Sequence, residues 1–401
     1  MCAPDKRSNI SSRKIYDMEN VEKIYPGVVA LRRKLHQTPE IAGKEFKTQA
    51  AILDYIKDLP LEVHPPYLET DVVAMLKGGK GDGPNVTLRA DIDALGLPEN
   101  TGAEFSSQIP GMMHACGHDI HTAMLAGAAR VLSSMKDELK GTVRFVWQPG
   151  EECVALGKKL VEAGAIDNPL PDRMTAIHVC PGLPVGTIAL KYGAIMASST
   201  HFKVTVTGKS GHGSAPFKSV SPIIAAAAMV TDLQQIIPNR IDPQNAAVLS
   251  FGIFKSGASD NVIPDEAVFA GSIRALDMKT AHLVADSLVE ICEGLAKAYQ
   301  VEVEFDINFS YNVTNNDKEQ TDIAAKVAQK SDIPVVWLEK ASMGGEDFCY
   351  FLEKAPGVYI RLGAGEDQPP LHNSKLLPPE EMMKYGIKYL VEFALDALKD
   401  K

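Results

Sequence analysis

Residues 142–178 read TVRFVWQPGEECVALGKKLVEAGAIDNPLPDRMTAIH and contain two short apolar segments with a longer segment between them. Thr142–Trp147 and Met174–His178 have the length and apolar composition of strands. Leu156–Ala163, between them, has apolar residues at helical spacing. Because a strand, a helix and a further strand in this order are typical of parallel pairing, the stretch predicts an α/β fold with a largely parallel sheet.

The same alternation continues on both sides of this stretch. Residues 20–58 predict helices with a break at Thr38-Pro39, and a last helix is predicted at Pro379–Leu398. We therefore expect a mixed, mostly parallel sheet with flanking helices. The other segments expected in this layer are strands at Val72–Leu76, Val86–Leu88, Val335–Leu338 and Val358–Leu362, and helices at His121–Ser134 and Thr321–Gln329.

A different pattern interrupts this alternation between residues 190 and 312. The order strand, helix, two strands, helix, strand is that of a ferredoxin-like α+β domain. We therefore predict an inserted domain at residues 190–312, within a main domain formed by residues 1–189 and 313–401. The expected strands are His201–Thr207, Ala247–Phe254, Ala267–Ala275 and Val301–Phe309, and the expected helices are Ile223–Ile237 and Thr280–Tyr299.

The composition excludes several classes of protein. A net charge of −10 argues against nucleic acid as a partner, because no basic stripe is present to displace phosphate counterions. The sequence has no run of about eighteen apolar residues that could cross a membrane, and residues 1–20 lack the apolar core of a secretory signal. Its cysteines are scattered without regular spacing, which suits a reducing cytoplasm. They are Cys2, Cys116, Cys153, Cys180, Cys292 and Cys349.

The segment His114-Ala-Cys116-Gly-His118-Asp119-Ile-His121 concentrates residues that can bind or orient a metal ion. Thiolate and imidazole suit zinc, manganese or a neighbouring transition metal. Cys116 and His118 are the expected ligands, because a tight turn at the intervening glycine lets both converge on one point. Asp119 is expected to accept the second ring N–H of a ligand histidine. For His114 and His121, a ligand role and a buried structural role both stay open.

A nucleophilic role for Cys116 is the alternative interpretation of this segment. A thiol beside a helix N-terminus has a lowered pKa, so Cys116 and His118 could form a metal-independent thiol amidase. A Cys–His dyad needs only one histidine, whereas a metal site explains the neighbouring histidines as well. Activity that survives exhaustive chelation would favour the thiol amidase.

Carboxylates follow two of the predicted strands, at the position where α/β proteins build their sites. Asp91 and Asp93 come after one strand, and Asp91 is expected to support the metal site. Glu151 and Glu152 come after another strand. Neighbouring residues on an extended backbone point in different directions, so one glutamate could bind metal while the other acts as a general base.

Three histidines outside these segments complete the set of candidates. His178 ends a predicted strand and His372 lies near the C-terminus. Both are candidates because a metal site needs further ligands. His212, in Gly211-His212-Gly213 of the predicted insert, is expected to be exposed because glycines flank it.

Together these motifs resemble the aminoacylase and carboxypeptidase-G type of metallopeptidases. More narrowly, they resemble the amidohydrolase branch of that family, which includes hippurate hydrolases and indole-acetyl-amino-acid hydrolases. The His-Ala-Cys-Gly-His-Asp segment is highly specific for this branch, and the resemblance extends over nearly the whole chain. The other matching segments are Leu31–His36, Gln148–Glu152, Asn261–Pro264, Met343–Phe348 and Leu371–Asn373.

The resemblance implies a site that holds two divalent metal ions, zinc or manganese first and cobalt or nickel as further possibilities. Glu151 would be the general base. The insert would be a lid and dimerisation domain, with His212 reaching the partner subunit's active site or closing over its own. The metal ligands that the resemblance implies are Cys116, His118, Glu152, His178 and His372. The substrate contacts that it implies are His212, Asn261 and Arg274.

Two segments depart from the pattern of the family. Pro216-Phe217 and Ser221-Pro222 stand where the family usually has Pro-His and Asp-Pro, and Cys153–Leu156 stands in place of a glycine-rich run. Both lie on the substrate side, so they bear on specificity more than on the reaction.

The resulting hypothesis is a metal-dependent amidohydrolase that cleaves N-acetyl, N-benzoyl or similar N-acyl amino acids. The expected partner is this small molecule, with no nucleic acid or membrane, in a homodimer formed through the insert. A metallo-carboxypeptidase or dipeptidase acting on short peptides is the enzyme alternative. A binding protein that keeps the fold without the chemistry is less favoured, because the base and the ligands are all present.

Overall fold

The computed structural model of the chain describes residues 6–399, without the side chains of residues 6–19, 153 and 154. Cys2 and the Cys153 side chain therefore lie outside the described part. The chain divides into two compact units. The first comprises residues 1–193, 315–339 and 350–401, and the second comprises residues 194–314 and 340–349. The second unit thus includes residues 340–349, which the predicted insert of residues 190–312 lacks.

An eight-stranded sheet forms the centre of the first unit, in the order β1-β2-β4-β3-β5-β16-β6-β15. The pairs β3–β4, β3–β5, β5–β16 and β6–β15 are parallel, whereas β1–β2, β2–β4 and β6–β16 are antiparallel. The predicted mixed, mostly parallel sheet is therefore confirmed. The strands are β1 (Glu62–Val63), β2 (Val72–Lys77), β3 (Asn85–Asp91), β4 (Thr142–Gln148), β5 (Arg173–Cys180), β6 (Ile188–Leu190), β15 (Val335–Trp337) and β16 (Gly357–Gly363).

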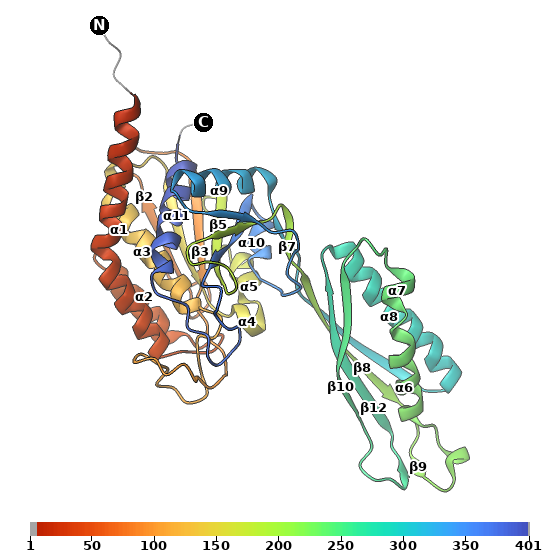
Figure 1. The fold of residues 1–401 in the computed structure, drawn as a ribbon. Helices are drawn as coiled ribbons and strands as arrows, with labels where there is room; N and C mark the ends of the chain where they lie inside the picture. The colour runs from red at the N-terminus through yellow and green to blue at the C-terminus, as the bar shows by residue number, and fades with distance from the viewer. Residues whose placement is uncertain (1–5, 400–401) are drawn as a thin grey trace. The chain divides into compact units, whose positions relative to one another are not determined.

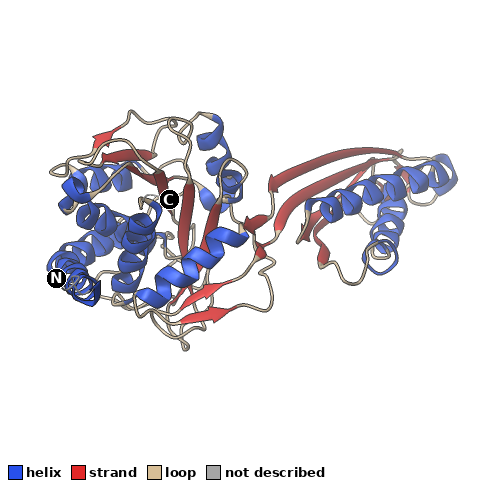
Figure 2. Cartoon of the chain, turned by 90° about the horizontal axis from the view of Figure 1, so that it is seen from above, coloured by secondary structure: helices blue, strands red, loops and turns tan. Residues whose placement is uncertain are grey.

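Helices lie on both sides of this sheet (Figure 2). α3 is buried along almost its whole length and packs against α1 and α11 (Figure 1). Gly386 of α11 allows this close approach, because a Cβ atom there would lie 2.0 Å from the Met124 sulfur. The helices of this unit are α1 (Lys6–Gln37), α2 (Phe46–Ile56), α3 (His118–Ser134), α4 (Glu151–Val154), α5 (Leu156–Glu162), α9 (Lys318–Lys330) and α11 (Met382–Ala397).

The second unit contains a four-stranded antiparallel sheet in the order β10-β12-β8-β13. Its apolar core lies between this sheet and the helices α6 and α8. With strands and helices in the order β8, α6, β10, β12, α8, β13, the unit has the predicted ferredoxin-like architecture. Its main elements are β8 (Ser198–Thr207), α6 (Pro222–Leu233), β10 (Ala247–Ser256), β12 (Glu266–Ala275), α8 (Met278–Tyr299) and β13 (Glu302–Tyr311).

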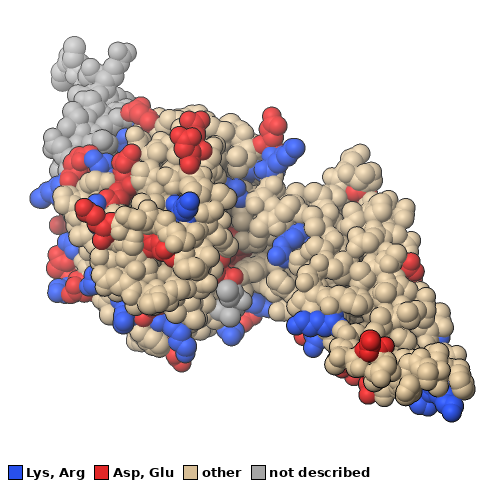
Figure 3. Space-filling view, turned by 60° about the horizontal axis from the view of Figure 1, so that its bottom comes forward, with Lys and Arg blue, Asp and Glu red and all other residues tan. Residues whose placement is uncertain are grey.

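The shorter elements connect these layers. They are η1 (Lys136–Glu138), β7 (Gly193–Met196), β9 (Gly211–His212), η2 (Pro216–Lys218), α7 (Ile236–Arg240), β11 (Val262–Ile263), β14 (Thr314–Asn316) and α10 (Cys349–Leu352). None of the helices within residues 6–399 has both the length and the apolar character that crossing a membrane requires. On the face of the first unit seen in Figure 3, Lys and Arg lie among Asp and Glu.

Candidate metal centre

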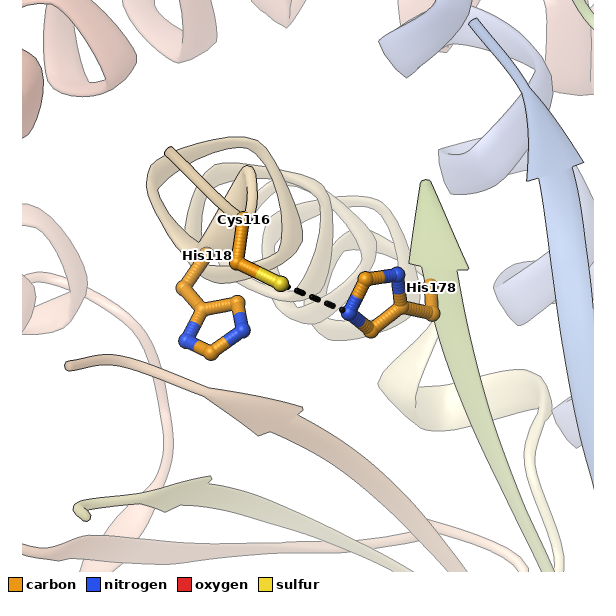
Figure 4. A group of neighbouring side chains, drawn as sticks. All are labelled: Cys116, His118 and His178. Atoms are coloured by element: carbon orange, nitrogen blue, oxygen red, sulfur yellow. Dashed lines mark hydrogen bonds between the residues drawn. The ribbon is translucent and has the colours of Figure 1, made fainter. Parts of the chain in front are cut away.

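Cys116 and His118 lie at the turn that begins α3. Gly117 between them has a φ of 82°. A Cβ atom at this glycine would lie 2.6 Å from Val179 Cγ2 on β5, so only glycine fits the turn. Figure 4 shows the Cys116 side chain directed toward His178 near the end of β5, with the His118 ring beside Cys116.

Two groups of potential ligands meet at Cys116. In the first, the ligand atoms of Cys116, His118 and His178 lie within 4.8 Å of one another, and Cys116 Sγ is 3.4 Å from His178 Nε2 (Figure 4). In the second, Cys116 lies within the same distance of Glu152 and His372. His372 Nε2 is 3.2 Å from a Glu152 carboxylate oxygen. All five predicted ligands are thus close together, and Cys116 belongs to both groups.

The hydrogen bonds of His118 and His178 leave their Nε2 atoms directed into the site. Nδ1 of His118 donates to the Asp93 carboxylate at 3.1 Å, and Nδ1 of His178 donates to the Val179 carbonyl at 2.8 Å. Among the described residues, buried His118 Nε2 has no hydrogen-bond partner. Sulfur, imidazole nitrogen and carboxylate oxygen together form a suitable set of donors for zinc and neighbouring transition metals. The residues present therefore fit a divalent metal centre.

Glu151 and Glu152 adjoin these ligands on the short helix α4. Gly150 precedes them with a φ of 63°, and the Glu152 N–H donates to Asp93 at 3.0 Å. The prediction that the two glutamates lie on extended backbone is wrong, because the glycine turns the chain into a helix directly after β4. Both still reach the site, with carboxylate oxygens within 4.8 Å of a His118 ring nitrogen.

A profile of the peptidase family M20/M25/M40 matches residues 87–396, which span every residue of this centre. The chain belongs to this family. The N-acetylcysteine deacetylase of Bacillus subtilis is 36% identical over 373 residues, which cover 93% of this chain and 97% of the relative. Thermostable carboxypeptidase 1 of Saccharolobus solfataricus is 38% identical over 376 residues, covering 92% and 94% of the two chains.

Comparison with solved structures identifies relatives in the same family. A crystal structure from Bacillus subtilis, described as a dinuclear metal-binding peptidase of the M20 family, has a TM-score of 0.83 and 33% identity. The match covers 94% of this chain and 99% of that one. The resemblance to the amidohydrolase branch of the metallopeptidases is therefore confirmed. As an M20-family member, the chain is a hydrolase that acts on amide bonds.

Burial and neighbouring carboxylates together determine the electrostatics of this M20-family site. Burial, together with the carboxylates of Glu152 and Glu151, raises the pKa of the Cys116 thiol well above its usual range. Burial alone would lower the pKa of His118, but Asp91, Asp93 and Glu152 raise it to about 10. The protein thus surrounds the thiol with negative charge, which a divalent cation would compensate.

The structure gives Asp119 partners different from those expected. Its Oδ2 forms an ion pair with Arg32 Nε at 2.9 Å and accepts a hydrogen bond from His36 Nδ1 at 2.8 Å. This oxygen therefore hydrogen-bonds none of the three predicted ligand histidines. Asp93, whose role was not predicted, faces the second ring nitrogen of His118 instead. Asp91 contacts His121, with the two atoms 2.6 Å apart. His114 is buried without a ring hydrogen bond among the described residues, and burial lowers its pKa to about 3.

Glu99 extends the buried network of His36 and predicts a pH dependence of stability. Burial alone would raise its pKa, but the hydrogen bonds from His36, Thr101 and Ser107 lower it to about 2. A lowered carboxyl pKa stabilises the fold above the unfolded value of about 4.3, and this contribution is lost as the pH falls toward the folded value. In metal-free protein, Glu99→Gln should therefore lower the midpoint of thermal unfolding at pH about 6, by an amount that shrinks toward pH about 3. A pH-independent difference between the two midpoints would contradict this account.

Glu45 is a second residue that the sequence did not reveal. It is fully buried, and one carboxylate oxygen accepts the N–H groups of Gly43 at 2.9 Å and Gly150 at 3.0 Å. The other oxygen accepts the Thr70 hydroxyl at 2.7 Å. Glu45 therefore fixes the turn that immediately precedes Glu151.

Replacing Glu45 by alanine should reduce kcat while metal binding persists, because the turn loses an anchor and Glu151, the expected general base, shifts. Displacements of this kind cost about 10- to 100-fold in rate. Glu40→Ala is the matched control, since Glu40 bonds Thr48 in the same region of the chain. Steady-state kinetics alongside metal analysis would separate the two variants, and equal losses in both would refute the role of Glu45.

The predicted substrate contacts His212, Asn261 and Arg274 all lie in the second unit. The first two are neighbours, because β9 pairs with β11 and the Gly213 N–H donates to the Asn261 carbonyl at 2.8 Å. Arg274 is half-buried near the C-terminal end of β12, whereas Asn261 precedes the start of this strand. The Arg274 guanidinium donates to Ser199 on β8. Arg274 is eight positions after Glu266, the first residue of β12, which corresponds to about 27 Å along the strand. The unit therefore brings His212 and Asn261 together but not Arg274.

Proposed function

We propose that this chain is a two-metal amidohydrolase that cleaves N-acyl amino acids into a carboxylic acid and a free amino acid. The observation that carries the proposal is the pair of ligand groups sharing Cys116, with Glu151 beside them. The names of two relatives, a deacetylase acting on N-acetylcysteine and a deacetylase acting on N-acetyldiaminopimelate, support the class of substrate. Zinc and manganese are the proposed ions, with cobalt or nickel as substitutes.

Cys116, His118 and His178 would hold one ion, and Cys116, Glu152 and His372 the other. When bound, such ions polarise the scissile carbonyl and lower the pKa of a water molecule. Glu151 is 7% exposed and close to the ligands, so its carboxylate can take the proton of the water. It then delivers that proton to the leaving amine, as a positioned acid–base group does.

The second unit would supply the remaining substrate contacts. His212 and Asn261 would donate hydrogen bonds to the developing oxyanion, and Arg274 would bind the carboxylate of the substrate. An N-acyl amino acid is far shorter than the length of β12, so it could not touch His212 and Arg274 of the same chain. This separation supports the proposal of a homodimer in which the inserted domain of one subunit completes the site of the other.

The thiol amidase alternative is disfavoured by the environment of Cys116. A nucleophilic cysteine requires a thiolate near neutral pH, whereas burial and two glutamates raise the pKa of this thiol. A carboxypeptidase remains the second candidate, because a relative 38% identical to the chain bears that name. It would use the same residues and differ only in the acyl group. We also propose a cytoplasmic location, in keeping with the four free cysteines among the described side chains.

The test combines metal analysis with a substrate screen. Purified protein should contain two divalent ions per chain, lose activity on chelation and regain it when zinc or manganese is restored. N-acetyl and N-benzoyl amino acids should be hydrolysed faster than dipeptides. Activity that survives exhaustive chelation would refute the two-metal mechanism, and a preference for dipeptides would favour the carboxypeptidase.

A further inference from the structure

We propose that His121 and Asp91 are positioning residues for His178 and act on it through the backbone of Val179. The inference rests on the proposed role of His178 as a metal ligand. It assigns a purpose to the one histidine of the α3 turn region whose ring is held by hydrogen bonds at both nitrogens.

The hydrogen bonds of His121 fix its tautomer. The Val179 N–H donates to His121 Nε2 at 2.9 Å. Because a backbone amide can only donate, this Nε2 carries no proton, and Nδ1–H donates to the Asp91 carboxylate at 2.6 Å. His121 lies close enough to Asp91 and His118 to suggest a third ligand group. However, both of its ring nitrogens are already engaged, so it has no lone pair for a cation.

Val179 links this histidine to the proposed ligand. Its carbonyl accepts His178 Nδ1–H at 2.8 Å, which leaves His178 Nε2 facing Cys116. The pairing of β3 with β5 ends at Arg89 and Ala176, so beyond that point the edge of β5 that faces β3 needs other partners, while β16 still pairs with the opposite edge. His121 supplies one, and its ring also packs on the His178 ring with a centroid separation of 4.6 Å.

Asp91 is anchored in turn. Arg89 donates through Nη1 to Asp91 Oδ2 at 2.8 Å and through Nε to Gln148 at 2.9 Å. One carboxylate oxygen of Asp91 therefore holds Arg89, and the other holds His121. All of these side chains are buried, so no solvent competes for the hydrogen bonds. A continuous series of hydrogen bonds therefore leads from β3 and β4 through His121 on α3 to the proposed ligand His178 on β5.

The experiment compares His121→Asn with His121→Gln by titrating metal-free, full-length protein with zinc. Asparagine can keep the donor to Asp91 but has no acceptor at the Nε2 position, whereas glutamine places an amide oxygen near Val179. His121→Asn should weaken one of the two zinc affinities by about 10- to 100-fold, the usual effect of removing a residue that orients a ligand. His121→Gln should recover part of this loss, and the zinc position built on Glu152 and His372 should be unaffected.

Leu132→Ala is the control for stability, because Leu132 is fully buried on the same helix and contacts no proposed ligand by hydrogen bond. It should leave both zinc affinities unchanged. Wild-type affinities in His121→Asn, or an equal weakening of both positions, would overturn the inference. If His121→Asn does not fold, Asp91→Asn tests the same series of hydrogen bonds. It should weaken zinc binding at the same one of the two positions.

His178→Ala distinguishes this inference from the proposed function. The variant should lose one zinc ion. If it does so while His121→Asn binds both ions normally, the inference alone fails and the ligand assignment stands. If His178→Ala keeps both ions, the ligand assignment fails and the inference falls with it.

Discussion

Replacing Glu151 by glutamine should lower kcat by about 10²–10⁴-fold, the usual contribution of a positioned acid–base group. Glutamine has nearly the same shape but cannot take a proton from water. Because the proposed ligands are other residues, the variant should keep both metal ions. Metal analysis and steady-state kinetics on the same preparation would measure the two effects separately.

Glu162→Gln is the control for this substitution. Glu162 is an exposed glutamate at the end of α5, eleven positions after Glu151. The same change of charge there should leave kcat and metal content unaltered. Near-wild-type turnover in Glu151→Gln would show that another residue is the base, and loss of metal would show that Glu151 is a ligand.

Replacing Cys116 by alanine should remove both metal ions and abolish turnover. The thiol belongs to both ligand groups, so its loss leaves two donors in each. By contrast, His178→Ala and His372→Ala should each remove one ion, because each histidine belongs to one of the two groups that share Cys116. Metal analysis of the three variants after dialysis would show whether the stoichiometries fall to zero, one and one.

Cys180→Ser is the matched control for the thiol. This cysteine lies on the same strand as His178, is partly buried and belongs to neither ligand group. Its substitution should leave two bound ions and full activity. A Cys116→Ala variant that still binds two ions would show that the two ions do not need a shared sulfur ligand.

The sequence predicted most of the sheet because its buried strands are continuous apolar runs between clear helices. Thr142–Trp147 and Met174–His178 were placed correctly for this reason. The helix α4 was missed because four residues are too few to show a helical period. The start of α3 at His118 instead of His121 was also missed, since the turn at Gly117 has no apolar pattern.

In the candidate site, residues that are close together in the sequence were easier to predict than residues that are far apart. Cys116 and His118 are neighbours in sequence, and their chemistry alone indicated a metal. His178 and His372 required the family resemblance, because a lone histidine carries no sign of its partners. The roles of Asp93 and Glu45 could not be predicted, since each depends on a backbone N–H that only the folded chain brings near. The prediction for Asp119 relied on its neighbours in sequence, but its hydrogen-bond partner is His36, which is far away along the chain.

The sharing of Cys116 has a consequence for the stoichiometry of proton release. Its raised pKa means that the metal-free thiol holds its proton near neutral pH. Binding of a first cation at either position requires that proton to leave. The second cation then meets a sulfur that is already ionised. The shared thiol therefore contributes its proton to the first binding step only, whichever position fills first, and calorimetry in buffers of different ionisation enthalpy would count the protons released in each step.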